Sequence, residues 1–87
     1  MHVHIAPSVG SVSVDGVTRY GFDMSSLTPD ISAIDWVDNE GVVQYKDITQ
    51  PKNRLVIIKD EIITDFSLYQ HFVDAWIIKD QQMKAGA

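Results

Sequence analysis

The chain is most informative in what it lacks. It has no cysteine, which excludes disulfide bridges, thiolate metal sites and cysteine nucleophiles. Lys and Arg number seven against twelve Asp and Glu, for a net charge of −5, and the basic residues are scattered along the chain. Because sequence-independent nucleic-acid binding needs clustered Lys and Arg, we expect no nucleic-acid partner. Apolar runs such as Leu55–Ile58 are too short to cross a bilayer, so we expect no membrane partner.

The residue patterns that carry catalysis or metal binding are also missing. The sequence has no glycine-rich phosphate-binding loop and no G-x-S-x-G nucleophile elbow. His2 and His4 share one side of a predicted strand, but only His71 is left to join them, and a zinc site needs more ligands. Asp38–Gly41 is typical of a turn and supplies too few oxygen ligands for calcium. We therefore predict no catalytic residues, no cofactor, no metal and no enzymatic activity.

The length of 87 residues predicts one domain with a small hydrophobic core. We expect this domain to span residues 1–87, with a frayed tail at about 84–87. A core of this size gains from association, because a partner covers apolar side chains that the monomer leaves exposed. Met1–Ile5 lacks the charged segment and apolar stretch of a signal peptide, so we expect a cytoplasmic or assembly-associated protein.

The first predicted hairpin covers Ser11–Phe22. Val12 and Val14 alternate with serine, which is typical of a half-buried strand. The Asp15-Gly16 pair that follows supplies, at low cost, the positive φ angles that a two-residue type I′ turn requires. This pair is the strongest local structural signal in the sequence.

A second hairpin is predicted from strands Ser32–Val37 and Val42–Asp47, joined by a turn at Asp38–Gly41. Two further strands are predicted from their β-branched residues, one at Val3–Ile5 and one at Leu55–Ile58. Together these segments predict a small antiparallel sheet built from two hairpins and extra strands.

One amphipathic helix is predicted at the C-terminal end, from an N-cap at Thr64 to about Met83. The residues expected to face the sheet are Tyr69, Phe72, Val73, Trp76 and Met83. Those expected to face outward are Gln70, Asp74, Lys79 and Asp80. Ile77 and Ile78 widen the apolar surface beyond one stripe, which indicates a second partner for the helix. The predicted fold class is therefore α+β.

Most of the aromatic residues are expected to pack in the core, but a core this small lacks room for all of them. Trp36, beside a hairpin turn, and Trp76, on the widened helix face, are the strongest candidates for a protein interface. Tyr69 and Ile77 complete the predicted interface on the helix.

Short motifs also recur in an order that resembles a known group of proteins. In chain order they are Val14-Asp15-Gly16, Gly21-Phe22-Asp23-Met24-Ser25-Ser26-Leu27, Ala33-Ile34-Asp35-Trp36, Gly41-Val42-Val43-Gln44-Tyr45 and Ile63-Thr64-Asp65-Phe66. Over roughly residues 11–76, this order resembles small proteins encoded in the tail or tail-fibre gene region of tailed bacteriophages and prophages. The chain departs from their pattern at Gln44, where an acidic residue is common, and in its longer loop at Thr49–Arg54.

The resemblance implies a non-enzymatic virion or assembly protein that docks to other phage structural proteins, in the virion or in the host cytoplasm during assembly. It carries over no catalytic residues. Homo-oligomerisation is expected, because virion proteins follow ring or fibre symmetry. An exposed edge strand, Val3–Ile5 or Leu55–Ile58, could add to a neighbour's sheet. The alternative is a small acidic phage inhibitor that binds a host protein, which the net charge of −5 permits.

Overall fold

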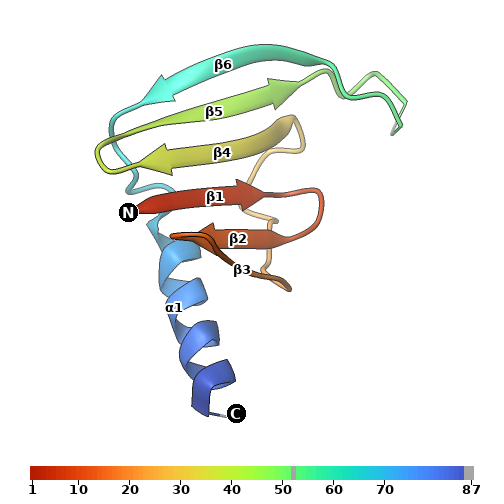
Figure 1. The fold of residues 1–87 in the computed structure, drawn as a ribbon. Coiled ribbons are helices and arrows are strands. Elements are labelled where there is room, and N and C mark those ends of the chain that lie inside the picture. The colour runs from red at the N-terminus through yellow and green to blue at the C-terminus, as the bar shows by residue number, and fades with distance from the viewer. Residues whose placement is uncertain (52, 86–87) are drawn as a thin grey trace.

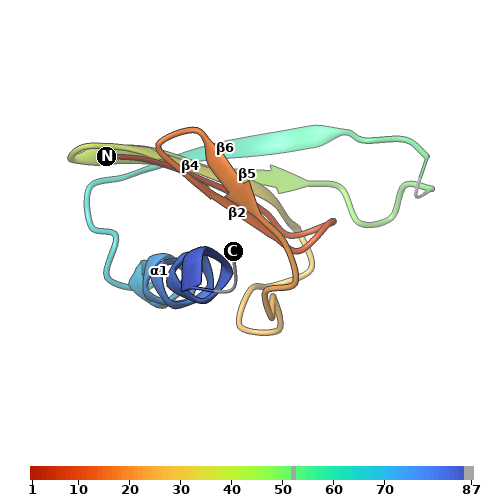
Figure 2. The same cartoon turned by 60° about the horizontal axis from the view of Figure 1, so that its bottom comes forward.

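The computed structural model describes residues 1–51 and 53–85. The elements are β1 (His2–Ala6), β2 (Ser11–Val14), β3 (Val17–Arg19), β4 (Ile31–Val37), β5 (Glu40–Lys46), β6 (Ile57–Ile63) and α1 (Gln70–Ala85). The strands form one six-stranded sheet in the order β3-β2-β1-β4-β5-β6, and every neighbouring pair is antiparallel. The helix α1 lies across one face of this sheet (Figures 1 and 2). The predicted α+β class, with an antiparallel sheet and one C-terminal helix, is confirmed.

The first hairpin, β2–β3, turns where the sequence predicts. Asp15 and Gly16 have φ angles of 49° and 86°, so both central positions adopt the left-handed conformation. The predicted hairpin over Ser11–Phe22 is too long, because β3 ends at Arg19. Gly21, with a φ of 86°, then turns the chain away from the sheet.

The second hairpin, β4–β5, is tighter than predicted. Val37 pairs with Glu40, which leaves only Asp38 and Asn39 in the turn instead of the whole Asp38–Gly41 segment. Asp38 has a φ of 55°, and its carboxylate accepts a hydrogen bond of 2.6 Å from the N-terminal ammonium group. This hydrogen bond lowers the pKa of Asp38 below its ordinary value. The start of the chain is thus tied to the turn of the second hairpin.

The strand at Val3–Ile5 is not an edge, so that part of the prediction is wrong. β1 lies between β2 and β4, and Val3 pairs with both Val14 and Trp36. The predicted strand at Leu55–Ile58 is displaced along the chain, because β6 spans Ile57–Ile63. It forms one edge of the sheet beside β5 (Figure 1).

The helix begins at Gln70 rather than after an N-cap at Thr64. The β5–β6 ladder continues to the pair of Gly41 with Ile63, and the chain must then cross from the sheet edge to the sheet face. An Asx turn at Asp65, whose carboxylate accepts a hydrogen bond from the Ser67 amide, makes part of this crossing. At the other end, α1 includes two residues of the predicted frayed tail, 84 and 85, and residues 86–87 lie outside the described part.

The core lies between α1 and the sheet. Its buried apolar residues are Val3, Ile5, Val12, Val14, Ile31, Ile34, Trp36, Val43, Phe66, Phe72 and Val73. The helix packs mainly on β2 and β3. Two helix residues do not face as predicted: Asp80, expected outside, is buried, and Met83, expected inside, is 51% exposed. Asp80 is buried because its carboxylate accepts a hydrogen bond of 2.8 Å from the Arg19 guanidinium group on β3.

Candidate docking surfaces

Two of the four predicted interface residues belong to one aromatic row inside the fold. The Trp36 and Phe66 ring centroids are 5.0 Å apart, and the Phe66 and Tyr69 centroids are 6.0 Å apart. Trp36 is only 7% exposed, and Tyr69 is half-buried just before α1. Burial, with smaller contributions from Tyr45 and Glu61, raises the pKa of Tyr69 above its ordinary value. In the described monomer, Trp36 therefore packs the core and leaves little surface for a partner.

The other two predicted residues, Trp76 and Ile77, are neighbours on α1 that face different ways. The Trp76 indole donates a hydrogen bond of 3.0 Å to the Val17 carbonyl oxygen, which fastens the helix to β3. Ile77 is 42% exposed and, among the described residues, lies outside the hydrophobic core and the side chains packed against it. The structure therefore brings Trp36 and Tyr69 together through Phe66, and places Ile77 away from them on the outer surface.

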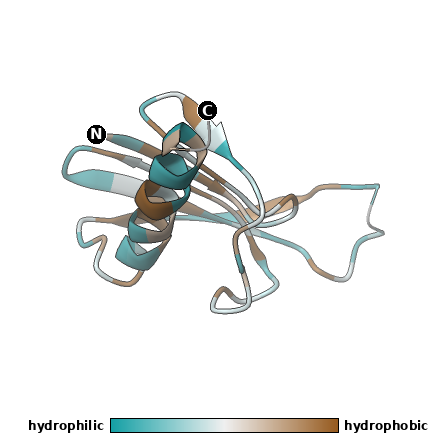
Figure 3. Cartoon of the chain, turned by 90° about the horizontal axis from the view of Figure 1, so that it is seen from below, coloured by the Kyte–Doolittle hydropathy of each residue, from teal (hydrophilic) through white to brown (hydrophobic). Residues whose placement is uncertain are grey.

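The outer surface of α1 carries an apolar patch made of Ile77 and Ile78. These side chains are 42% and 57% exposed. Figure 3, which views the molecule from the helix side, shows a hydrophobic band crossing the outward surface of the helix between hydrophilic turns. We call Ile77 and Ile78 the helix patch. Because exposed aliphatic side chains gathered on one surface commonly mark a protein contact, the helix patch is the first candidate docking surface.

A shallow hollow lies along the helix patch, between α1 and the loop after β3. It is lined by Phe22 from the loop and by Ala75, Ile78 and Lys79 from the helix, among others. The Lys79 ammonium group lies 5.1 Å from the centre of the Phe22 ring, a cation–π contact. Asp23 also lines this hollow, so a basic and an acidic side chain both lie beside the apolar helix patch.

The second candidate surface is β6, which shares Ile57 and Ile58 with the edge strand predicted at Leu55–Ile58, whereas Ile62 and Ile63 were not predicted at an interface. Six of its seven side chains are exposed and the seventh is half-buried. Ile58 and Ile62 are 65% and 67% exposed. The sequence does carry a signal for this surface. Two isoleucines flank a charged triplet on each side, and this pattern lacks the alternation of apolar and polar residues that is typical of a half-buried strand.

The paired histidines meet a carboxylate on the face of the sheet that α1 leaves open. His2 Nε2 lies 2.7 Å from Asp35 Oδ1, and His4 Nδ1 lies 3.5 Å from the same oxygen. All three side chains are about half exposed. In residues 1–51 and 53–85, no group of three or more His, Cys, Asp or Glu side chains is arranged to hold a metal ion.

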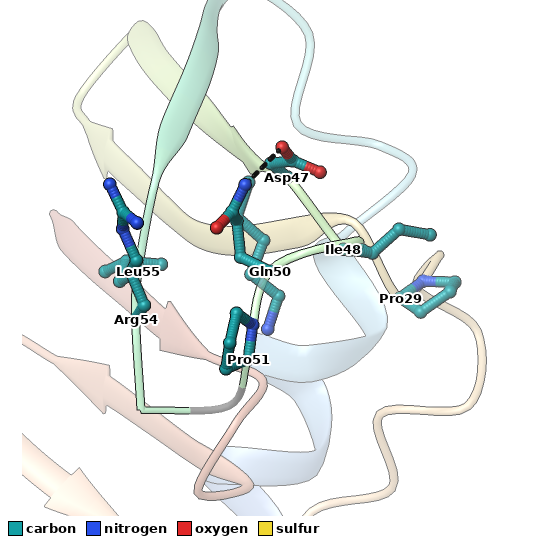
Figure 4. Close-up of a pocket in the computed structure, with 8 residues that line it drawn as sticks. Pro29, Asp47, Ile48, Gln50, Pro51, Arg54 and Leu55 are labelled. Carbon is teal, nitrogen blue, oxygen red and sulfur yellow. Dashed lines mark hydrogen bonds between the residues drawn. The ribbon is translucent and has the colours of Figure 1, made fainter.

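The loop between β5 and β6 forms an open hollow of about 270 Å³ (Figure 4). Its one carboxylate, Asp47, accepts hydrogen bonds from the side chain and the amide of Thr49 and from the Gln50 side chain. These hydrogen bonds, that of the Thr49 side chain foremost, lower the pKa of Asp47. Arg54 and Leu55 line the opposite wall in Figure 4. The carboxylate is thus occupied in shaping the loop, and the hollow offers no nucleophile paired with a base among its described residues.

In the described part of the chain, no helix combines the length and apolarity that crossing a bilayer would take. Comparisons with protein-family models, with curated proteins and with solved structures give no match. The candidate surfaces therefore have to be interpreted from their own residues.

Proposed function

We propose that the chain is a non-enzymatic bacteriophage structural or assembly protein of the tail or tail-fibre region. It acts by docking to other phage structural proteins and associates with copies of itself. The phage context is supported by the order of the motifs from Val14-Asp15-Gly16 to Ile63-Thr64-Asp65-Phe66, which resembles that group of proteins. Its place of action is the virion, or the host cytoplasm while particles assemble.

The observation that carries the docking role is the helix patch. Phe72 and Val73 on one side of α1 are each 2% exposed, so the helix is already fixed to the sheet. Ile77 and Ile78 therefore contribute little to the fold, and their exposure lowers the solubility of the free chain. A partner that covers both side chains removes this cost, and each isoleucine contributes roughly 1.5–3 kcal/mol when fully buried.

The alternative function, a small acidic inhibitor of a host protein, needs carboxylates that are free to contact a basic partner. Several carboxylates are already occupied by groups of their own chain. Asp38 binds the N-terminal ammonium group, Asp47 binds Thr49 and Gln50, and Asp80 binds Arg19 and Lys84. This use of charge favours the docking role over imitation of nucleic acid.

The test is genetic complementation in a phage or prophage that carries the gene. Deleting the gene is expected to yield particles with missing or defective tails in electron micrographs, and the wild-type gene is expected to restore them. A variant with Ile77→Asp and Ile78→Asp should fold but fail to restore tails. The matched control is Val9→Asp, an apolar-to-acidic change at a 62% exposed side chain in the turn between β1 and β2, and it should restore them. Thermal unfolding checks that all variants are folded.

Two outcomes would count against the proposal. Normal tails after deletion, with fewer phage released per cell, would favour the inhibitor that acts on a host protein. Restoration by the double isoleucine variant would remove the helix patch from the docking surface.

A further inference from the structure

The sequence of β6 is complementary to itself. It is Ile57-Ile58-Lys59-Asp60-Glu61-Ile62-Ile63, with a basic and an acidic residue on the two sides of a central aspartate and isoleucines beyond them. When two such strands run antiparallel with their centres aligned, each residue lies opposite the one equally far on the other side of Asp60. Every Lys59 then lies opposite a Glu61, and every Ile58 opposite an Ile62.

We propose that two copies of the chain pair antiparallel along β6, with Asp60 opposite Asp60, and form a symmetric dimer. The two six-stranded sheets then join into one continuous sheet about a two-fold axis. The dimer deepens the proposed docking function, because it names one partner, a second copy of the chain. Only the biological use of the dimer rests on that proposed function.

The edge of β6 is open to such a partner. Among residues 1–51 and 53–85, β6 pairs with β5 alone, and Figure 1 shows it as the outermost strand, on the side of the sheet away from α1. The helix packs mainly on β2 and β3, at the opposite edge. A second β6 can therefore approach without displacing any described element.

The charges of β6 are placed to form alternating pairs. Lys59 and Glu61 lie on the face of the sheet that carries the helix, because they pair with Tyr45 and the buried Val43. Lys59 Nζ is 3.3 Å from Glu61 Oε2 and 5.2 Å from the Tyr45 ring centre, so its side chain is already held on this face. In the dimer, four charges of alternating sign surround the two-fold axis, and each ion gains a cross-strand neighbour of opposite charge.

The isoleucines complete the contact on the other face. Asp60 and Ile62 pair with Gln44 and Val42, which line the open face together with His4. The ladder with β5 is irregular at Ile58, because Tyr45 pairs with Lys59 and Lys46 with Ile57. In the dimer, Ile58 lies opposite Ile62 twice, and these pairs cover side chains that are 65% and 67% exposed in the monomer. The cost is one apposition of like charges, Asp60 against Asp60, near the axis.

The charges also select one register. Edge strands often carry charged residues that block pairing, and here a shift by two residues in either direction does produce repulsion. One shift sets Lys59 opposite Lys59 of the second copy, and the other sets Glu61 opposite Glu61. Only the register centred on Asp60 brings opposite charges together and isoleucine against isoleucine.

The decisive experiment is charge exchange on β6, measured as solution mass by light scattering over a dilution series. The wild-type chain is expected to reach twice its monomer mass of 9.8 kDa as concentration rises. Lys59→Glu sets two glutamates against each other in both cross-strand pairs, and Glu61→Lys sets two lysines, so each variant alone should stay monomeric. An equimolar mixture of the two variants should regain the dimer, because every pair is then of opposite charge. The double variant Lys59→Glu, Glu61→Lys should dimerise alone.

Controls separate the register from simple changes of net charge and from misfolding. Asp74→Lys on α1 changes the charge by as much as Glu61→Lys but lies away from β6, and it should leave the dimer intact. Asp60→Asn should tighten the dimer by roughly twofold to fivefold, since it removes the like-charge apposition. Circular dichroism checks that each variant is folded, and recovery of mass in the mixture proves that both variants are competent.

The proposal is overturned if the wild-type chain stays monomeric into the millimolar range. It is also overturned if the single variants dimerise like the wild type, or if their mixture stays monomeric. These results leave the tail-assembly test untouched, because that test depends on Ile77 and Ile78 and is read in particles. Loss of tail assembly with an intact β6 dimer, or the reverse, therefore shows which of the two surfaces fails.

Discussion

β4 and β6 are strands of equal length in the same sheet, and their surroundings could hardly differ more. Each has seven residues and pairs with β5 on one side. In β4, Ile31, Ile34 and Trp36 are buried, and Trp36 packs against Phe66 in the segment before α1. In β6, six side chains are exposed. Figure 2 shows α1 under one part of the sheet while β6 and the loop before it extend beyond its cover. Backbone pairing is thus enough to define a strand, but burial on one face decides how much the strand stabilises the fold.

The largest difference in stability is expected when an isoleucine is replaced by alanine in β4 and, separately, in β6. Ile34→Ala in β4 removes a side chain that is 0% exposed, and we expect a loss of roughly 2–5 kcal/mol in the free energy of unfolding. Ile62→Ala in β6, where the side chain is 67% exposed, should change it by less than about 0.5 kcal/mol. Urea denaturation of the monomer measures both. Equal losses in the free energy of unfolding would mean that the side chains of β6 are buried to the same degree as those of β4.

A smaller effect is expected where the covered strand meets β5. Gly41 pairs with Trp36, and an added Cβ would lie 2.6 Å from the Asp35 carbonyl oxygen and 2.7 Å from Trp36 Cε3. Gly41→Ala should therefore cost about 1–3 kcal/mol through overpacking. Gly16→Ala is the control, because a Cβ there meets open space and only the φ of 86° costs energy, roughly 1 kcal/mol. If Gly41→Ala lowers the free energy of unfolding no more than Gly16→Ala does, the Trp36 ring moves aside freely.

The smallest effect concerns ion pairs and depends on pH. Lys84 first, and then Arg19, lowers the pKa of Asp80 by donating hydrogen bonds to its carboxylate. A carboxyl group with a lowered folded pKa stabilises the fold above its unfolded pKa, ordinarily about 3.9, and this contribution disappears as the pH falls through the folded value. Asp80→Asn should therefore lower the urea midpoint at pH 7, with the gap to wild type narrowing below about pH 4.

The comparison for this prediction is Glu61→Gln in β6, which removes an exposed ion pair. Lys59 and Glu61 are 61% and 45% exposed, so solvent screens their attraction and the urea midpoint should hardly change at any pH. The measurements are made at dilutions where the chain is monomeric. If the difference in urea midpoint between Asp80→Asn and the wild type is the same at pH 7 and pH 2.5, the substitution removes packing and not a charge interaction.

Local signals predicted the first half of the fold better than the second. The Asp15-Gly16 turn is confirmed because its residues alone determine the backbone angles. The predicted start of the helix, directly after an N-cap at Thr64, is wrong: α1 begins at Gln70, because residues 64–69 carry the chain from the sheet edge, where Ile63 pairs with Gly41, to the sheet face. That pairing joins segments far apart in the chain, and no local pattern encodes it.

Contacts between distant parts of the chain also decided which of the predicted interface residues are exposed. The number of aromatic residues, too many for a small core, predicted Trp36 at an interface, yet Trp36 packs against Phe66 and is only 7% exposed. Its part in an interface, like that of Tyr69, Trp76 and Ile77, stays a prediction. The ion pair of Arg19 with Asp80 was missed because the two residues are 61 positions apart.

By itself, the sequence determined the α+β class, the two hairpins and the presence of one C-terminal helix, because turn angles and the spacing of apolar residues are local properties. Only the tertiary structure decided that β1 is central, that β6 is an uncovered edge, and that Ile77 and Ile78 face outward while Asp80 is buried. The physical reason is that burial depends on which distant segments come to cover a side chain. The same chemical group, an isoleucine, is a core residue in β4 and an exposed residue in β6, because other segments of the chain cover β4 and leave the side chains of β6 open.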